Sequence, residues 1–201
     1  DEAITLDPKY KYAWYNKGLA LDSLKKYQEA VEAFDEAIKI DPNYKQAWVF
    51  KGNALNDLEK SDDAMAAYKQ AVTIDPEYVY AWYKQGSTLL LSFQKYEEAI
   101  KAYDKAIELD PSDDDSWSGK GVALLALGRT QEALQAQEKA ISLDPNEELH
   151  WFQKGMALQV LGRFDEAVEA FDKAIALGDT EHAPAAKLKL QEKTGGGSAK
   201  W

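Results

Sequence analysis

Residues 45–78 read KQAWVFKGNALNDLEKSDDAMAAYKQAVTIDPEY, and the landmarks of this stretch recur along the whole chain. A tryptophan is followed four residues later by a glycine, then by spaced alanines, and finally by a proline. The tryptophans stand at positions 14, 48, 82, 117 and 151, so the steps between them are 34, 34, 35 and 34 residues. A fixed period of this length predicts a repeat architecture, in which each unit packs on its neighbours.

Each unit reads as two helices separated by a short break, such as Lys25-Lys26. After the break, Ala30, Phe34 and Ala37 follow the spacing of one helical face. An Asp-Pro pair ends the second segment, because the residue before proline avoids helical φ/ψ and proline is excluded from a helix interior. The sequence therefore predicts antiparallel helix pairs. One pair cannot bury its own apolar face, so the pairs must stack.

This pattern resembles the tetratricopeptide repeat (TPR), W-x2-L-G followed by A-x3-F and P, over residues 11–179. The resemblance implies an all-α, right-handed superhelical solenoid. Two departures recur in every unit. Leucine replaces the late tyrosine of the first helix. The residue before the glycine, where the family usually has leucine, is polar and predicts a more solvated flank whose lysine stems cover apolar surface; it is Lys17, Lys51, Gln85, Lys120 and Lys154.

The repeats predict the organisation of the chain. Residues 1–10 match the end of a second helix, so we expect the chain to be a fragment of a longer array. One extra residue within Leu89–Gln94 should lengthen a turn or make a bulge in the helix. We expect five repeats, at residues 11–44, 45–78, 79–113, 114–147 and 148–179. A capping helix should follow at residues 180–193, and a flexible glycine-rich tail at residues 194–201.

Composition excludes several classes of protein. The 201 residues carry 24 basic and 35 acidic side chains, and a net charge of 24 − 35 = −11 does not suit a nucleic-acid binder. The absence of cysteine excludes disulfides, thiolate zinc sites and cysteine nucleophiles. No apolar run is long enough to span a membrane, and the first residues do not resemble a signal peptide. We therefore expect a cytoplasmic protein with no membrane partner.

No motif argues for catalysis. Asp113-Asp114-Asp115 lacks the glycine and the closing glutamate of a calcium loop, so Ser112-Asp113 should instead cap the helix that follows. We expect His150 to be a surface residue, because no second ligand accompanies it. The sequence predicts no enzyme, no cofactor and no bound metal.

The resemblance also implies a binding groove, lined by the first helix of each pair. Its positions lie two residues before, one after and five after each tryptophan, and they vary between repeats. Repeats one and three place paired tyrosines there, which suits a recognition surface, although such rings could instead only shield neighbouring helices. The expected groove residues are Tyr12, Tyr15, Asn16, Leu19, Val49, Asn53, Tyr80, Tyr83, Lys84, Ser87, Phe152 and Met156. Less distinctive residues at these positions are Gln46, Asp115, Ser118, Val122 and Leu149.

These observations predict a non-catalytic scaffold that binds a peptide or partner protein in the groove. An aromatic groove in an acidic body suits a ligand with apolar side chains at its centre and basic residues at its flanks. One TPR binding mode clamps the C-terminal carboxylate of a peptide with basic groove residues. Those basic residues are missing from this sequence. The alternative function is self-assembly, in which exposed repeat ends stack into homo-oligomers.

Overall fold

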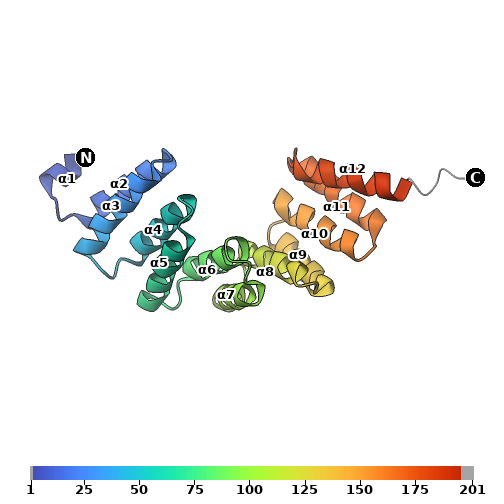
Figure 1. Ribbon diagram of the computed structural model, residues 1–201, viewed down its shortest axis with the longest axis horizontal. Helices are drawn as coiled ribbons and strands as arrows, with labels where there is room; N and C mark the ends of the chain where they lie inside the picture. The colour runs from blue at the N-terminus through green and yellow to red at the C-terminus, as the bar shows by residue number, and fades with distance from the viewer. Residues whose placement is uncertain (1, 196–201) are drawn as a thin grey trace, which may run out of the picture. The chain divides into compact units, whose positions relative to one another are not determined.

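The computed structural model describes residues 2–195, and within them every regular element is an α-helix (Figure 1). The predicted all-α solenoid fold is confirmed, since the helices follow one another in packed pairs. Their bounds are α1 Glu2–Leu6, α2 Lys11–Ser23, α3 Tyr27–Ile40, α4 Lys45–Asp57, α5 Ser61–Ile74, α6 Val79–Leu91, α7 Tyr96–Leu109, α8 Asp114–Ala126, α9 Thr130–Leu143, α10 Glu148–Val160, α11 Phe164–Leu177 and α12 His182–Gly195.

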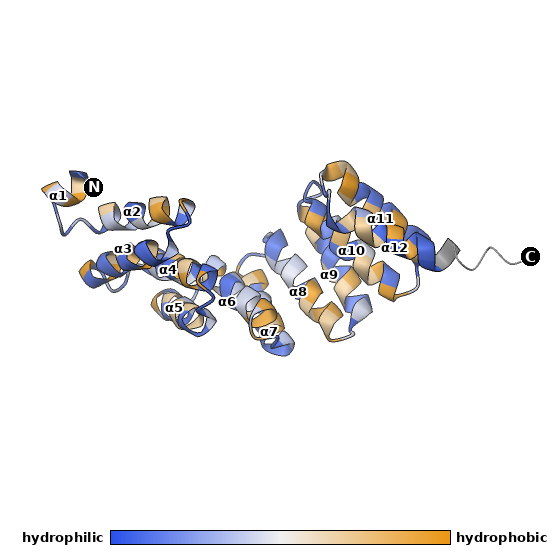
Figure 2. Cartoon of the chain, turned by 45° about the horizontal axis from the view of Figure 1, so that its top comes forward, coloured by the Kyte–Doolittle hydropathy of each residue, from blue (hydrophilic) through white to orange (hydrophobic). Residues whose placement is uncertain are grey.

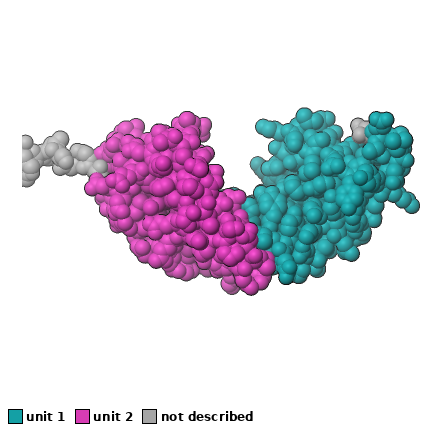
Figure 3. All heavy atoms as spheres, turned by 180° about the vertical axis from the view of Figure 1, so that it is seen from behind, with its two compact units in different colours: residues 1–94 teal, residues 95–201 magenta. Residues whose placement is uncertain are grey.

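The chain divides into two compact units, residues 1–94 and residues 95–201 (Figure 3). The division falls in the turn between α6 and α7. This turn spans residues 92–95, one residue more than the turns at 24–26 or 58–60. Helix α6 has 13 residues, as do α2 and α4, so the extra residue lies in the turn and adds no bulge to the helix.

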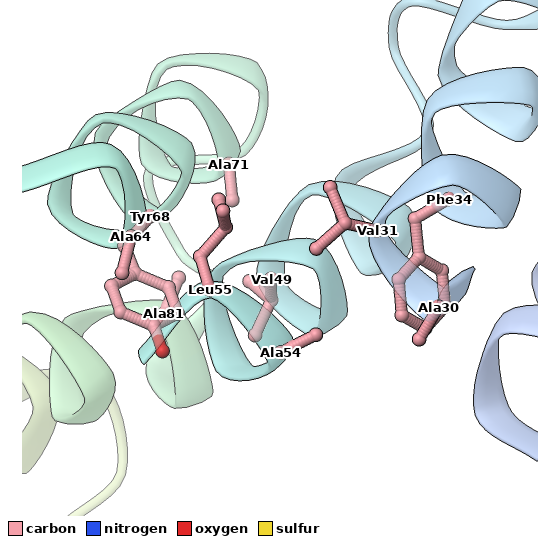
Figure 4. Packing of buried hydrophobic residues seen from close by; sticks show 10 residues of the cluster. All are labelled: Ala30, Val31, Phe34, Val49, Ala54, Leu55, Ala64, Tyr68, Ala71 and Ala81. Atoms are coloured by element: carbon pink, nitrogen blue, oxygen red, sulfur yellow. The ribbon is translucent and has the colours of Figure 1, made fainter. Parts of the chain in front are cut away.

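Small residues of the first helices accept the large rings of the second helices. Phe34 and Tyr68 are almost completely buried in the core of unit 1, part of which is shown in Figure 4. A Cβ atom at Gly18 would lie only 2.5 Å from the Phe34 ring, and one at Gly52 would lie 2.5 Å from the Tyr68 ring. Apolar residues alternate with polar ones along the helices, as expected for elements with one buried face (Figure 2). These glycines therefore allow the helices of repeats one and two to approach closely.

Each Asp-Pro pair ends a second helix in the same way. The aspartates after α3 and α5, Asp41 and Asp75, have extended backbone conformations. Each carboxylate accepts a backbone N–H two residues ahead, at 3.0 Å in both cases, from Asn43 and Glu77. The aspartate thus stabilises the turn that the proline forces on the chain.

The repeated tryptophans are partly buried and hold the turn in front of their own helix. Each indole Nε1–H donates to the carbonyl oxygen of the proline six residues earlier. Trp48 donates to Pro42 at 2.9 Å, and the five bonds range from 2.9 to 3.2 Å. We call this contact the Trp–Pro hydrogen bond; it ties the first helix of one repeat to the end of the preceding second helix.

The lysines that replace the family's leucine lie over these tryptophans. Lys51 Nζ is 5.4 Å from the centre of the Trp48 ring system, and the lysines of repeats one, four and five lie within 5.6 Å of theirs. Lys51 also pairs with Asp35 at 2.7 Å. The four lysines are half-buried over these rings, whereas Gln85 of repeat three is only 7% exposed, so the prediction of a more solvated flank was wrong for repeat three.

At the C-terminal end, α12 packs on α11 through the buried Ala183 and Leu190. Asp179, which replaces the expected proline, accepts the backbone N–H groups of Glu181, His182 and Ala183 at 2.8–3.0 Å and so caps α12. The helix continues to residue 195, two residues into the segment predicted as a tail. The other tail residues, 196–201, lie outside the described part of the chain.

Candidate peptide-binding face

The first helices of unit 1 form one continuous face. Helix α2 contacts α4, and α4 contacts α6. The second helices α3 and α5 are both fully described, and they make no such contact with each other. The first helices are therefore the more closely spaced layer of unit 1. The side of this layer that faces away from α3 and α5 is called the inner face of unit 1.

Aromatic rings cross this face from α2 to α6. Tyr15 of α2 lies 5.1 Å from Tyr44 and 5.8 Å from Phe50 of α4, measured between ring centres. Phe50 lies 6.2 Å from Tyr80 of α6, which stacks on Tyr83 at 6.3 Å. Tyr12 meets Tyr44 edge-on at 5.7 Å. These spacings are those of favourable aromatic pairs. We call this set the aromatic array; its members are Tyr12, Tyr15, Tyr44, Phe50, Tyr80 and Tyr83.

The rings of the array are partly exposed at the surface and also pack against other residues of the chain. Tyr12 is 48% exposed, whereas the other members are half-buried. Tyr15 also packs against Phe34 of the core at 5.9 Å, and burial raises the pKa of the Tyr15 hydroxyl. Burial together with the neighbouring tyrosines raises the pKa of Tyr44 to about 12. These rings therefore shield neighbouring helices while remaining partly exposed, and Tyr12 is the most accessible of them.

Asn53 joins the array to the core. Its side-chain Oδ1 accepts the Tyr68 hydroxyl at 2.9 Å, and its Nδ2 donates to the Tyr80 hydroxyl at 3.3 Å. Tyr68 is buried, and this burial raises its pKa. The Asn53 amide thus positions Tyr80 and is already engaged by this chain.

Lysines lie over the rings at both ends of the array. Lys84 Nζ is 5.1 Å from the ring centre of Tyr80 and 5.4 Å from that of Tyr83. Lys11 lies 4.9 Å from the ring centre of Tyr44 and pairs with Asp41, which lowers the pKa of that carboxyl group. These contacts order the ring faces and leave cationic groups at the edge of the array.

Comparison with known proteins is consistent with this geometry. Family models described as tetratricopeptide repeat match residues 12–44, 51–114, 84–148 and 151–180. The chain belongs to the tetratricopeptide repeat family. A search of the curated proteins gives no match.

Several solved TPR structures share the fold. YrrB, described as a TPR protein with an unusual peptide-binding site, is 23% identical, with a TM-score of 0.69 over 92% of this chain and 96% of that one. MamA is 27% identical, with a TM-score of 0.71 over 82% and 95%. PilF of Pseudomonas aeruginosa is 18% identical, with a TM-score of 0.82 over 94% and 86%. These similarities show the TPR fold, and membership of the TPR family supports a protein-interaction scaffold.

The other TPR groove positions of unit 1 differ in what they can contact. Val49 is completely buried in the core, so its prediction as a groove residue was wrong: this position faces the packed side of α4. Leu19 is half-buried against the same core, and Ser87 is half-buried on α6. Asn16 is exposed but lies away from the array, in a hollow that it shares with Ala13 and Leu24.

In unit 2, the groove positions form no comparable array. Phe152 and Met156 are partly buried against the core, and Phe152 lies 6.0 Å from Phe171. Ser118 is buried and donates its hydroxyl to Gln137 at 3.2 Å, so it is not available to a ligand. Leu149 is 47% exposed, Asp115 is exposed, and Val122 is half-buried.

His150 is buried, so its prediction as a surface residue was wrong. It is 1% exposed, and its Nε2 lies 2.9 Å from Asp114 Oδ2 across the contact between α10 and α8. The equivalent residues of repeats two and three, Ala47 and Ala81, are also completely buried. The position therefore belongs to the interface between first helices, and in repeat five a polar pair occupies it.

The start of α8 also differs from the expected cap. Asp113 is the N-cap residue, but its carboxylate accepts the Ser116 hydroxyl and makes no side-chain hydrogen bond to the helix backbone. The Ser112 hydroxyl instead donates to Asp110 at 2.6 Å. Within the described residues, no group of three or more His, Asp or Glu could hold a metal ion. No helix of the described part is both long and apolar enough to cross a bilayer.

Phe50, the ring that links the two ends of the array, was not among the expected groove residues. It lies two residues after a tryptophan, where the other repeats have Asn16, Lys84, Gly119 and Gln153. An aromatic residue at a position that is otherwise polar or small was the available signal. Tyr44, which follows Pro42 by two residues, was likewise not among the expected groove residues, although its ring contacts those of Tyr12 and Tyr15.

Proposed function

We propose that this TPR chain is a non-catalytic scaffold that binds a peptide segment of a partner protein on the inner face of unit 1. The aromatic array carries the proposal, because partly exposed rings that are held by their neighbours offer contact area with little loss of conformational entropy on binding. Tyr12, Tyr80 and Tyr83 are the expected anchors. YrrB, a TPR protein with a peptide-binding site, supports peptide binding by a chain of this fold.

The partner should present apolar side chains at its centre and Lys or Arg at its flanks. Apolar groups match the rings of the array, and anchors of this kind dominate binding energy. The net charge of −11 attracts basic flanks over long range, and this attraction mainly raises the association rate. Lys11 and Lys84 occupy ring faces at the edges of the array, so the basic flanks of the ligand should lie beyond these two lysines, over the acidic surface.

A peptide selected from a random 12-residue display library provides the test. Its affinity should fall about 30-fold or more, or about 2 kcal/mol, when Tyr12→Ala and Tyr83→Ala are combined. Tyr27→Ala is the matched control, because Tyr27 begins α3 and lies outside the array. Titration calorimetry measures affinity, and circular dichroism checks the fold. Unchanged binding by the double variant would place the site elsewhere.

Self-assembly is a second candidate, supported by a hollow of about 450 Å³ on α2 that its neighbours leave open. Leu24, at one end of this hollow, is 68% exposed, so a second copy could bury apolar area there. Sedimentation velocity over a hundredfold range of concentration tests this candidate. A dimer that Leu24→Glu abolishes would support it, and a monomer at every concentration would remove it.

A further inference from the structure

A second hollow lies on the side of unit 1 away from the inner face. It lies where α3 and α5 diverge and leave part of α4 uncovered. Its volume is about 520 Å³, within the range of sites that hold small ligands or single side chains. No part of the aromatic array lines it. The residues around it are Val31, Asp35, Trp48, Lys51, Leu55, Asp63, Ala66, Ala67 and Gln70.

The walls combine apolar surface with one aromatic ring. Val31, Leu55 and Ala67 are at most 7% exposed, so they form firm, packed walls; Figure 4 shows the first two on neighbouring helices. Trp48 is partly exposed, and its indole is fixed by the hydrogen bond to Pro42. A ring held in this way presents its face to the hollow without a further loss of side-chain freedom.

One side of the hollow already binds a cation from this chain. Lys51 Nζ lies 5.4 Å from the centre of the Trp48 ring system and 2.7 Å from Asp35 Oδ1. An aromatic face next to a carboxylate is thus an arrangement that holds a positive group here.

The other side offers the same type of carboxylate without a cation. Asp63 is equivalent to Glu29 of repeat one, which pairs with Lys26 at 3.1 Å. The lysine that could serve Asp63 in repeat two is Lys60, but its Nζ donates to Gln28 Oε1 at 3.2 Å. Among the described residues, Asp63 has no basic partner.

We propose that this hollow is a binding site for an arginine side chain of a peptide or protein partner. The guanidinium group would pair with Asp63 and lie against the exposed part of Trp48, while the aliphatic stem would contact Val31 and Ala67. Arginine fits better than lysine, because its planar group stacks on rings and is less strongly hydrated. The site is independent of the array, so either proposal can fail without the other.

A similar hollow of about 400 Å³ lies at the equivalent place in repeat one, where Glu29 is already paired with Lys26. Trp14, Lys17 and Leu21 line it, as Trp48, Lys51 and Leu55 line the first. The hollow is therefore a repeated feature of the packing of these helix pairs.

The tripeptide acetyl-Gly-Arg-Gly-amide is the probe, with the citrulline tripeptide as its uncharged isostere. In proton–nitrogen NMR spectra, the arginine probe should shift the indole resonance of Trp48 in a saturable way, and the citrulline probe should not. Asp63→Asn should weaken arginine binding at least fivefold. Asp62→Asn, the matched control, removes the same charge from a neighbouring residue that does not line the hollow, and it should change affinity less than twofold.

Equal weakening by Asp63→Asn and Asp62→Asn would show diffuse attraction to an acidic surface and would overturn the proposal. So would an indole resonance of Trp48 that does not move, or equal binding of the citrulline probe. Circular dichroism of each variant checks the fold, and exposed aspartates at these positions should tolerate the change.

Discussion

Gly18→Ala should destabilise the chain, although alanine is the better helix former. The Cβ of alanine would lie 2.5, 2.7 and 2.8 Å from three ring atoms of Phe34, whereas carbon atoms prefer about 3.5–4.0 Å. Phe34 is completely buried, so its ring cannot swing into solvent. Overpacking of this kind costs about 1–3 kcal/mol, and helix propensity returns about 0.8–1.0 kcal/mol. The difference is a net loss of up to about 2 kcal/mol.

A double-mutant cycle measures this clash directly. Phe34→Leu removes the ring atoms that the new Cβ would meet, so Gly18→Ala should be neutral or stabilising in the Phe34→Leu background. Urea denaturation followed by circular dichroism gives the free energy of unfolding of all four proteins. If Gly18→Ala alone stabilises the chain, or if the two changes are simply additive, the close approach of these helices is not what requires glycine.

Three further predictions follow from contacts that recur in the repeats. Trp48→Phe keeps most of the apolar area but loses the hydrogen bond to Pro42, and thermal unfolding should report a loss of about 1 kcal/mol. Glu59→Gly should stabilise by about 0.5–1 kcal/mol in urea, because Glu59 has a positive φ of 60° that glycine adopts without strain, although glycine also gains more freedom on unfolding. Burial raises the pKa of Tyr44 and Tyr78 to about 12, so an absorbance titration at alkaline pH should show these hydroxyls ionising well above the ordinary tyrosine pKa of 10. Their stabilisation is complete below the ordinary pKa of 10 and is lost as the pH rises toward 12, which denaturation at pH 9 and pH 11 would reveal.

The fold could be predicted from the sequence because its determinants are local and repeated five times. Tryptophan, glycine and Asp-Pro recur at fixed positions of the repeat, and each has one structural role that the geometry of the chain requires. The Trp–Pro hydrogen bond itself was not visible, since an indole could equally have been an apolar filler. The period showed where tryptophan stands but not which polar group its N–H would find.

The candidate site was only partly predictable, because it depends on contacts between helices far apart in sequence. Tyr12 and Tyr80 were found at variable positions of the repeat. Val49 occupies the same repeat position as Tyr15 and Tyr83, which are half-buried, but it is itself completely buried, so the repeat register alone does not decide exposure. His150 was misplaced for a related reason: its partner Asp114 lies 36 residues away, in the preceding repeat.

The Trp–Pro hydrogen bond has a consequence for how such a chain can be shortened, lengthened or recombined. Because Trp48 holds the carbonyl of Pro42, the turn before a helix pair belongs structurally to the pair that follows it. A segment excised from Lys45 onward would leave its first indole without the acceptor that it uses here. A segment that begins at Asp41 would carry the aspartate, the proline and the tryptophan together. The transferable module of this chain therefore starts at the Asp-Pro pair, four residues before the helix that it supports.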